Sequence, residues 1–478
     1  MSGRRVLTTE SRESALIDDM TFRVARALAA TSTGFASLLA AGIATAAGAQ
    51  QPTLPTLRLG EAIETAHRVH PDVRAARDAL AAAAARERQA SAYPNPTLSY
   101  GREQTSAAGE TNSQTIAVFE QRLEIGGVRS ARGEAARLRR EAAAARLDAA
   151  VTALDFETTR AYALALAADR RAQLADQANE AFAQARAISD RRLAAGDVSG
   201  YAHRRIRLEA ARYAGARAEA LLARRAARLS LAALISGTED SVASKDVVLA
   251  DSLPTFGRPL AGGNAARPDL QLTQLATPDS LVALAVRSRR DLRAVELEAD
   301  AARAEARLTA RERVPQPAVS LGFKNERVAG APEQANGFIA GISLPLPLWD
   351  RREGAIAAAD AESRRRVAEA DVVRQRVARE VAEAYDGYRA LEAQLAVLAP
   401  ELGGETGVAM RAVQVAYTEG EATVVEWLDA VRAYQEAESS FATLRAETMI
   451  RRAAFERALG VPLTDTTTRP GADASARD

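Results

Sequence analysis

Histidine and carboxylate side chains are the groups of this chain best suited to bind a metal, and the chain has only three histidines. His67 and His70, with Glu64, are spaced to share one face of a helix, where imidazole nitrogens and a carboxylate can coordinate a divalent cation. No fourth ligand is visible, so a pair of solvated histidines is the simpler interpretation. The chain has no cysteine, which excludes disulfides, thiol catalysis and thiolate metal ligands.

Catalytic patterns are missing from the sequence as well. It contains no nucleophile–base motif, no glycine-rich phosphate loop and no zinc signature. We therefore expect a protein that is not an enzyme and that uses no cofactor and no resident metal.

Two motifs of the form G-x-x-[ST] are the most informative polar sites, namely Gly196 with Ser199 and Gly420 with Thr423. Glycine permits a tight turn, and the hydroxyl can cap the helix that follows. This structural role explains the motif completely. A second role, in which the exposed turns contact another protein, remains an equal alternative.

Glu426 and Asp429 lie just beyond the second of these motifs, three residues apart on a predicted helix. That spacing places both carboxylates on one face. Carboxylates brought together in this way attract cations and repel one another. The alternative is an ordinary solvated helix face.

The elements that carry these residues are predicted to be long helices. The chain has 478 residues, of which 26% are charged and only 4% are aromatic, and it is rich in Ala, Arg, Glu and Leu. This composition is typical of packed helices rather than of ordinary globular cores. The net charge of +1 gives no electrostatic reason to expect a nucleic-acid partner.

The sequence contains two copies of one repeating unit. Residues 70–75 resemble residues 289–294, and each copy is followed by a paired proline, at Pro94 and Pro96 and then at Pro315 and Pro317. The corresponding turns follow at Gly196 and Gly420, so the offset between the copies drifts only from 219 to 224 residues. An ordered series of matches like this indicates an internal duplication.

Five segments follow from this duplication. Residues 1–49 read as a signal peptide, with a small-x-small site at Ala47-Gly48-Ala49 and Met20 as an alternative start. A transmembrane anchor is the alternative, although the segment has little Leu, Ile or Phe. The other segments are a first repeat (50–237), an inter-repeat linker (238–278), a second repeat (279–460) and a disordered tail (461–478).

Each repeat combines helices with one β-hairpin. The predicted helices are 58–92, 128–195, 200–236, 279–313, 352–418 and 421–459, with a kink near Pro400 in the fifth. The predicted hairpins span 97–123 and 318–346, with strands at 97–105, 114–123, 318–326 and 337–346. In these strands apolar side chains alternate with polar or small ones, as in Val319, Leu321 and Phe323.

The strands allow two interpretations. Each is roughly ten residues long, which is enough to cross a bilayer when tilted. Four strands cannot close a barrel, and open sheet edges are not tolerated in lipid, so a membrane role requires several chains to share one barrel. The alternative is a pair of ordinary amphipathic hairpins on a soluble sheet.

Taken together, residues 57–460 resemble the TolC-type outer-membrane efflux proteins. The layout of helix, hairpin and long helical pair, repeated twice, carries the resemblance. Pro94-Asn95-Pro96 followed by the run from Leu123 to Arg129 resembles the subgroup that serves heavy-metal pumps of the resistance-nodulation-division type, and the run from Pro345 to Arg351 fits the second-repeat counterpart.

The resemblance implies a mainly α fold with a small β part. In that family three chains form a homotrimer, with a twelve-stranded barrel in outer-membrane lipid and a helical tunnel in the periplasm. It further implies two protein partners, a periplasmic adaptor and an inner-membrane pump. The turns at Gly196, Ser199, Gly420 and Thr423 would contact the adaptor, and Tyr417, Glu426 and Asp429 would form the aperture gate.

Two residues depart from the family pattern at this gate. Ala422 stands where a polar gate partner is typical, and Arg205 occupies the first-repeat position equivalent to Asp429. The contacts that close the aperture are therefore expected to differ from those of other members.

The sequence thus predicts a passive exit duct of a tripartite efflux system, carrying heavy-metal cations or small toxic compounds. Two alternatives remain at this point: an exit channel for type I protein secretion, and an exported helical scaffold in the periplasm that forms no channel.

Overall fold

The computed structural model describes residues 56–107, 109–236, 248–251, 253, 270–271, 277–329, 332–402 and 406–464. The chain divides into two units, Met1–Thr53 and Leu54–Asp478, and every described residue belongs to the second. The predicted signal peptide lies outside the described residues, as do most of the predicted linker 238–278 and of the tail 461–478.

The described residues are mainly helical, as predicted. The helices are α1 (Leu59–Val69), α2 (Pro71–Ala90), α3 (Val128–Ala195), α4 (Gly200–Ile235), α5 (Pro278–Ser288), α6 (Arg290–Arg311), α7 (Glu353–Leu402), α8 (Thr406–Glu419) and α9 (Val424–Leu459). Helix α7 ends at Leu402 and α8 begins at Thr406, and residues 403–405 lie outside the described residues, so the kink near Pro400 stays a prediction. Within the described parts, no helix is both long and apolar enough to cross a membrane.

Two predicted helices, 58–92 and 279–313, are each broken in two, and the single-helix prediction is wrong there. His70 ends α1 in an extended conformation (ψ 130°), because Pro71 disfavours the helical conformation in the residue before it. Arg289 makes the same break in the second repeat (ψ 123°) without a proline. Its guanidinium instead bonds Asp291 and Glu380, each at 2.6 Å.

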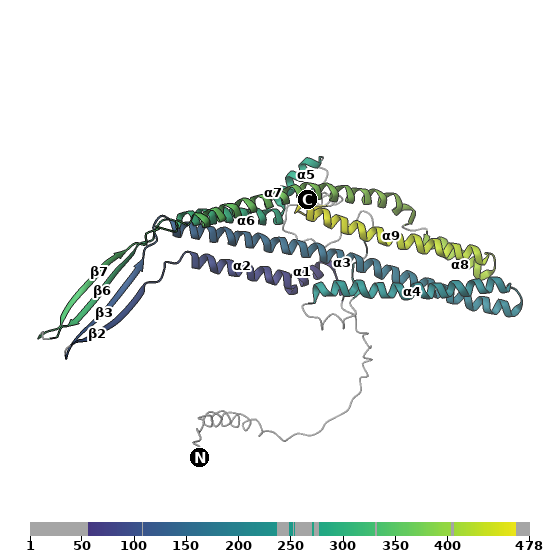
Figure 1. Ribbon diagram of the computed structural model, residues 1–478. Coiled ribbons are helices and arrows are strands. Elements are labelled where there is room, and N and C mark those ends of the chain that lie inside the picture. The colour runs from purple at the N-terminus through teal and green to yellow at the C-terminus, as the bar shows by residue number, and fades with distance from the viewer. Residues whose placement is uncertain are drawn as a thin grey trace, which may run out of the picture. The chain divides into compact units, whose positions relative to one another are not determined.

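The strands β2 (Thr97–Ala107), β3 (Glu110–Arg122), β6 (Ala318–Arg327) and β7 (Ala335–Ser343) form one antiparallel sheet in the order β2-β3-β6-β7. Both predicted hairpins are confirmed. The pairing of β3 with β6 joins the two repeats, and β2 and β7 are left as the edges. Figure 1 shows these strands extending from the helices of the same unit.

Two further sheets have two strands each. β1 (Thr56–Leu57) pairs in parallel with β4 (Val248–Leu249), and β5 (Leu270–Gln271) pairs in parallel with β8 (Leu463–Thr464). Leu463 is buried against α5, α7 and α9. The predicted disordered tail therefore begins too early, because residues 461–464 belong to the fold.

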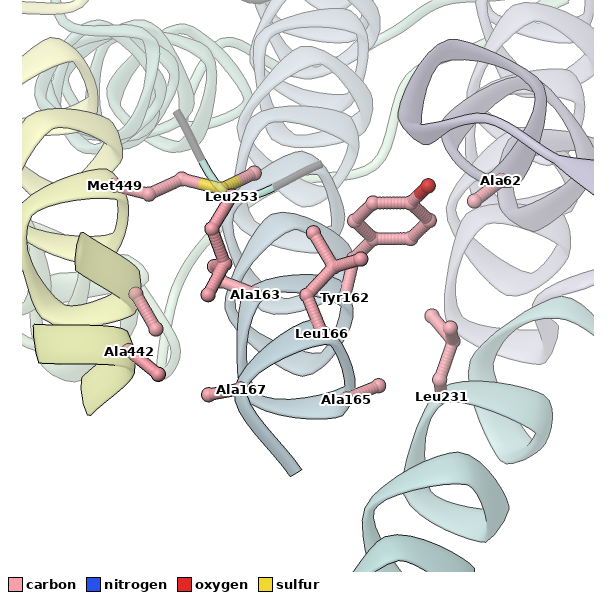
Figure 2. Close-up of a cluster of buried hydrophobic side chains, with 11 residues drawn as sticks. Ala62, Tyr162, Ala163, Ala165, Leu166, Ala167, Leu231, Leu253, Ala442 and Met449 are labelled. Atoms are coloured by element: carbon pink, nitrogen blue, oxygen red, sulfur yellow. The ribbon is translucent and has the colours of Figure 1, made fainter. Parts of the chain in front are cut away.

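Helix α3 is the centre of the packing. It contacts α2, α4, α6 and α9, while α7 contacts α6 and α9. About half of the buried apolar residues are alanines, which let helix backbones approach closely. Figure 2 shows one cluster in which Tyr162 of α3 faces Ala62 and Leu231, with Met449 on the other side. The Tyr162 hydroxyl donates to the Asp251 carboxylate at 3.0 Å, so this buried phenol is satisfied.

Candidate functional site at the helical tips

The predicted turns after α3 and α8 have the same backbone geometry. Gly196 and Gly420 both adopt left-handed conformations, with φ of 81° and 91°. In each turn the amide after the glycine bonds a carbonyl five residues back: Asp197 N to Arg192 O at 2.9 Å, and Glu421 N to Ala416 O at 2.8 Å. This closing pattern favours glycine at the left-handed position. We call the turns tip 1 (residues 196–199) and tip 2 (residues 420–423).

The hydroxyl residues of both tips cap the returning helices, as predicted. Ser199 Oγ accepts the Ala202 amide at 3.2 Å. At tip 2, Thr423 Oγ1 accepts the Glu426 amide at 3.3 Å, and Glu426 returns a bond by accepting the Thr423 amide at 2.8 Å. Tip 2 therefore carries a complete capping box and tip 1 only half of one.

The capping box occupies the carboxylate of Glu426. Besides the Thr423 amide, Glu426 Oε2 accepts the Thr423 hydroxyl at 2.8 Å. These hydrogen bonds from the Thr423 backbone and hydroxyl lower the pKa of Glu426. The side chain stays exposed and ionised, so it keeps its negative charge while it holds the start of α9.

Beneath the tips, the two repeats share a buried core. The tip cluster consists of Phe182 and Ala185 of α3, Ile206 of α4, Tyr417 of α8, and Trp427, Leu428 and Val431 of α9. The Phe182 ring stacks on Tyr213 at 4.2 Å between centroids and meets Trp427 edge-on at 4.8 Å. Aromatic pairs at these distances stabilise beyond their buried area. The cluster fixes the two tips relative to one another.

Tyr417, predicted as a gate residue, lies inside this cluster. Its ring stacks on Trp427 at 5.1 Å, and burial raises the pKa of its phenol, opposed by the charge of Arg192. Arg192, in the last turn of α3, was not predicted from the sequence. It donates from Nη2 to the Thr418 carbonyl at 3.2 Å, with its guanidinium 5.9 Å from the Tyr417 ring centroid. This arginine bonds the end of α3 directly to the end of α8.

The remaining gate candidates lie on the surface around the cluster. Asp429 is exposed, one turn beyond Glu426, and makes no hydrogen bond or ion pair with any described residue. Ala422 is half-buried and packs against the tip cluster, so the position that departs from the family pattern contributes apolar contact. Arg205 is half-buried on α4.

The predicted histidine site does not assemble. His70 lies outside the helices, where its Nδ1 accepts the Asp72 amide at 3.3 Å. His67 contacts the carboxylate of Asp155 on α3, and Glu64 is exposed. Because His70 ends α1, it does not share a helix face with Glu64 and His67, and that part of the prediction is wrong. The simpler interpretation, in which these histidines bind no metal, stays a prediction. No group of three potential ligands among His, Cys, Asp and Glu exists among the described residues.

Residues 281–461, most of the second repeat, match the family described as outer membrane efflux protein. The predicted resemblance to the TolC-type outer-membrane efflux proteins is confirmed. The chain is also 27% identical, over 266 residues, to the cobalt-zinc-cadmium resistance protein CzcC of Cupriavidus metallidurans. That match covers 56% of this chain and 57% of the relative, so the chain spans little more than half of the relative's length.

Solved channel structures share the fold over most of the chain. CusC matches with a TM-score of 0.64 and 18% identity, covering 85% of this chain and 93% of its own. VceC of Vibrio cholerae gives 0.64 and 19%, covering 85% and 97%. The open-state MtrE channel of Neisseria gonorrhoeae gives 0.64 and 20%, covering 86% and 91%. At these identities the likeness establishes the architecture alone.

Proposed function

We propose that this protein is the outer-membrane exit duct of a tripartite efflux system, working as a homotrimer. The observation that carries the proposal is the four-stranded sheet, which exposes large apolar side chains on one face and has two unpaired edges. A soluble sheet of this length normally buries its apolar face against another layer. The efflux family that the second repeat matches supports the same conclusion.

The register places the apolar side chains in rows across the sheet. Leu98 of β2 pairs with Phe119 of β3, which pairs in turn with Leu321 of β6, and all three side chains are exposed. Two residues along, Phe323 pairs with Phe338, which is 83% exposed. Residues directly opposite one another share a face, so these rows form one continuous apolar surface. Tyr93 and Trp349 are also exposed, near the base of the hairpins, as in the aromatic girdles of membrane strands.

Closure of the duct follows from the sheet edges. Strands β2 and β7 each present an unpaired edge, which cannot persist in lipid. Pairing β2 of one copy with β7 of the next in a ring of three gives twelve strands and leaves no edge. The barrel would then lie in outer-membrane lipid, with the helices forming a tunnel on the periplasmic side.

The helices offer a matching pair of edges. Helix α4 packs on α3 and α1, and α7 and α8 pack on the other side of the unit. Along α4 exposed large side chains occupy four of five positions spaced seven residues apart, at Tyr201, Leu208, Leu222 and Leu229, with Gly215 at the remaining position. This spacing is that of a helix–helix seam. The exposed Val408 and Val415, seven residues apart on α8, are its counterpart on the next copy.

In this duct we expect the helical tips to contact the adaptor and to surround the aperture, as predicted from the sequence. Tips 1 and 2, through Gly196, Ser199, Gly420 and Thr423, would meet a periplasmic adaptor that links the duct to an inner-membrane pump. Tyr417, Glu426 and Asp429 would belong to the aperture gate, since three copies of tip 2 bring their carboxylates together around the axis. A pump of the resistance-nodulation-division type is favoured by the motif resemblance at Pro94–Pro96 and Leu123–Arg129.

The cargo class follows from the relative CzcC, the cobalt-zinc-cadmium resistance protein. We expect heavy-metal cations, with small toxic compounds as the wider class, to pass through without chemical change. Deletion of the gene should lower tolerance to cobalt, zinc or cadmium and leave the profile of secreted proteins unchanged. An altered secreted-protein profile with normal metal tolerance would instead favour type I secretion.

The membrane assignment is tested by fractionation. The protein should be found in the outer membrane as a heat-modifiable trimer. Phe338→Asp should reduce membrane assembly, because a charge on the lipid face is costly, whereas Ser99→Asp, on the opposite face, should assemble normally. A soluble monomer in the periplasm would contradict the proposal and favour the scaffold.

A further inference from the structure

A large cavity lies where the helices meet the sheet, at the opposite end of the unit's helices from the tips. Its volume is about 870 Å³, it is open to solvent on one side, and it is lined by α2, α3, α6 and the segments that connect them to the strands. Five arginines line it, namely Arg86, Arg122, Arg132, Arg139 and Arg352, together with three glutamates. Nothing in the tip site uses these residues.

The three glutamates are each paired with one arginine. Glu124 accepts two bonds from Arg132, at 2.5 and 2.9 Å, and Glu312 accepts one from Arg352 at 2.5 Å. Glu305 pairs with Arg139. The acidic groups of the cavity are therefore neutralised by its own walls.

Two guanidinium groups remain. The side chains of Arg86 on α2 and Arg122 at the end of β3 make no hydrogen bond or ion pair with the part of the chain that the structure describes. The cavity thus carries an excess of two positive charges, on planar groups whose donors match the geometry of an oxyanion.

The sheet register indicates which way the cavity opens. Arg122 pairs with Ala318, and alternation places both on the face opposite Phe119 and Leu321. Phe119 and Leu321 belong to the apolar face that the proposed function directs toward lipid. Arg122 therefore points into the duct, and this orientation rests on that proposed function.

We propose that this cavity is a binding site for small oxyanions inside the duct. Its two unpaired guanidinium groups supply the positive charge and the planar donors that an oxyanion needs. A trimer would carry three such sites.

The test is electrical and uses the full-length protein in planar bilayers of zwitterionic lipid. Inorganic phosphate should block the current in a concentration-dependent manner. Arg86→Gln with Arg122→Gln should weaken the phosphate block about tenfold or more, because charged hydrogen bonds are lost.

The matched control is Arg88→Gln with Arg102→Gln. It removes the same charge from the same helix and the same sheet, at exposed arginines that do not line the cavity. An equal loss of phosphate block in both double variants would overturn the site. So would an absence of block in the unmodified protein, as expected if a lipid headgroup filled the cavity. A protein that forms no channel at all would contradict the proposed function itself.

Discussion

The bond between the two tips offers the sharpest test of how the duct closes. Arg192 joins α3 to α8 through one hydrogen bond to the Thr418 carbonyl, at 3.2 Å, and one cation–π contact with Tyr417, at 5.9 Å. Both distances are near the upper limit for a contact of their kind, a hydrogen bond and a cation–π contact. If the aperture opens by separating the two helical hairpins of each chain, Arg192→Ala should favour the open form.

The magnitude follows from these two contacts. A hydrogen bond from a half-exposed charged group at this distance contributes about 1 kcal/mol, and an exposed cation–π contact about 0.5–1 kcal/mol. Their loss, about 1–2 kcal/mol per chain, corresponds to roughly a 5- to 30-fold shift in the equilibrium between closed and open tips. Ala422 cannot compensate, because its side chain has no polar group.

Single-channel recording can measure this shift as the fraction of time spent in the open state. Arg191→Ala is the matched control, since Arg191 is the neighbouring arginine and bonds only its own helix, at the Ala187 carbonyl. Thermal unfolding of both variants should remain close to that of the unmodified protein. An open fraction for Arg192→Ala equal to that of Arg191→Ala would refute the reasoning and place the lock elsewhere.

Three further predictions concern stability. Thr423→Ala removes the capping box and should lower the free energy of unfolding by about 1 kcal/mol, seen as a lower melting temperature, with a smaller loss for alanine at the N-cap serine of α4. Gly322→Ala should lower the free energy of unfolding by about 1–3 kcal/mol, because the added Cβ would lie 2.7 Å from a carbonyl oxygen of β3. Gly337→Ala is the control, because its Cβ would meet nothing within 4 Å. Equal losses of stability in the two variants would contradict the packing argument. Burial alone would raise the pKa of Asp291, but the guanidinium of Arg289 outweighs this and lowers it. The ionised Asp291 therefore contributes to the free energy of unfolding above about pH 4, and this contribution is lost at lower pH as the carboxylate is protonated. Asp291→Asn should flatten this acid dependence, measured by unfolding at several pH values.

Local chemistry determined the elements that the sequence predicted well. The bounds of α3, α4 and the four long strands follow from residues near in sequence: the absence of proline, apolar alternation, and a glycine at each turn. The duplication is visible for the same reason, since both copies must satisfy the same local rules. Even the caps at Ser199 and Thr423 depend on residues only three positions away.

Tertiary structure decided which of these elements meet. The break at Arg289 is not preceded or followed by a proline, and the Arg289 guanidinium there bonds Glu380, which is 91 residues away. Arg192 reaches Thr418 across 226 residues, so no local pattern marks it among the many arginines of the chain. The placement of Arg86 and Arg122 beside the same cavity became apparent only in the folded chain, because they come from different elements, α2 and β3. A sequence fixes short-range geometry directly, whereas long-range contacts depend on packing that brings distant segments together.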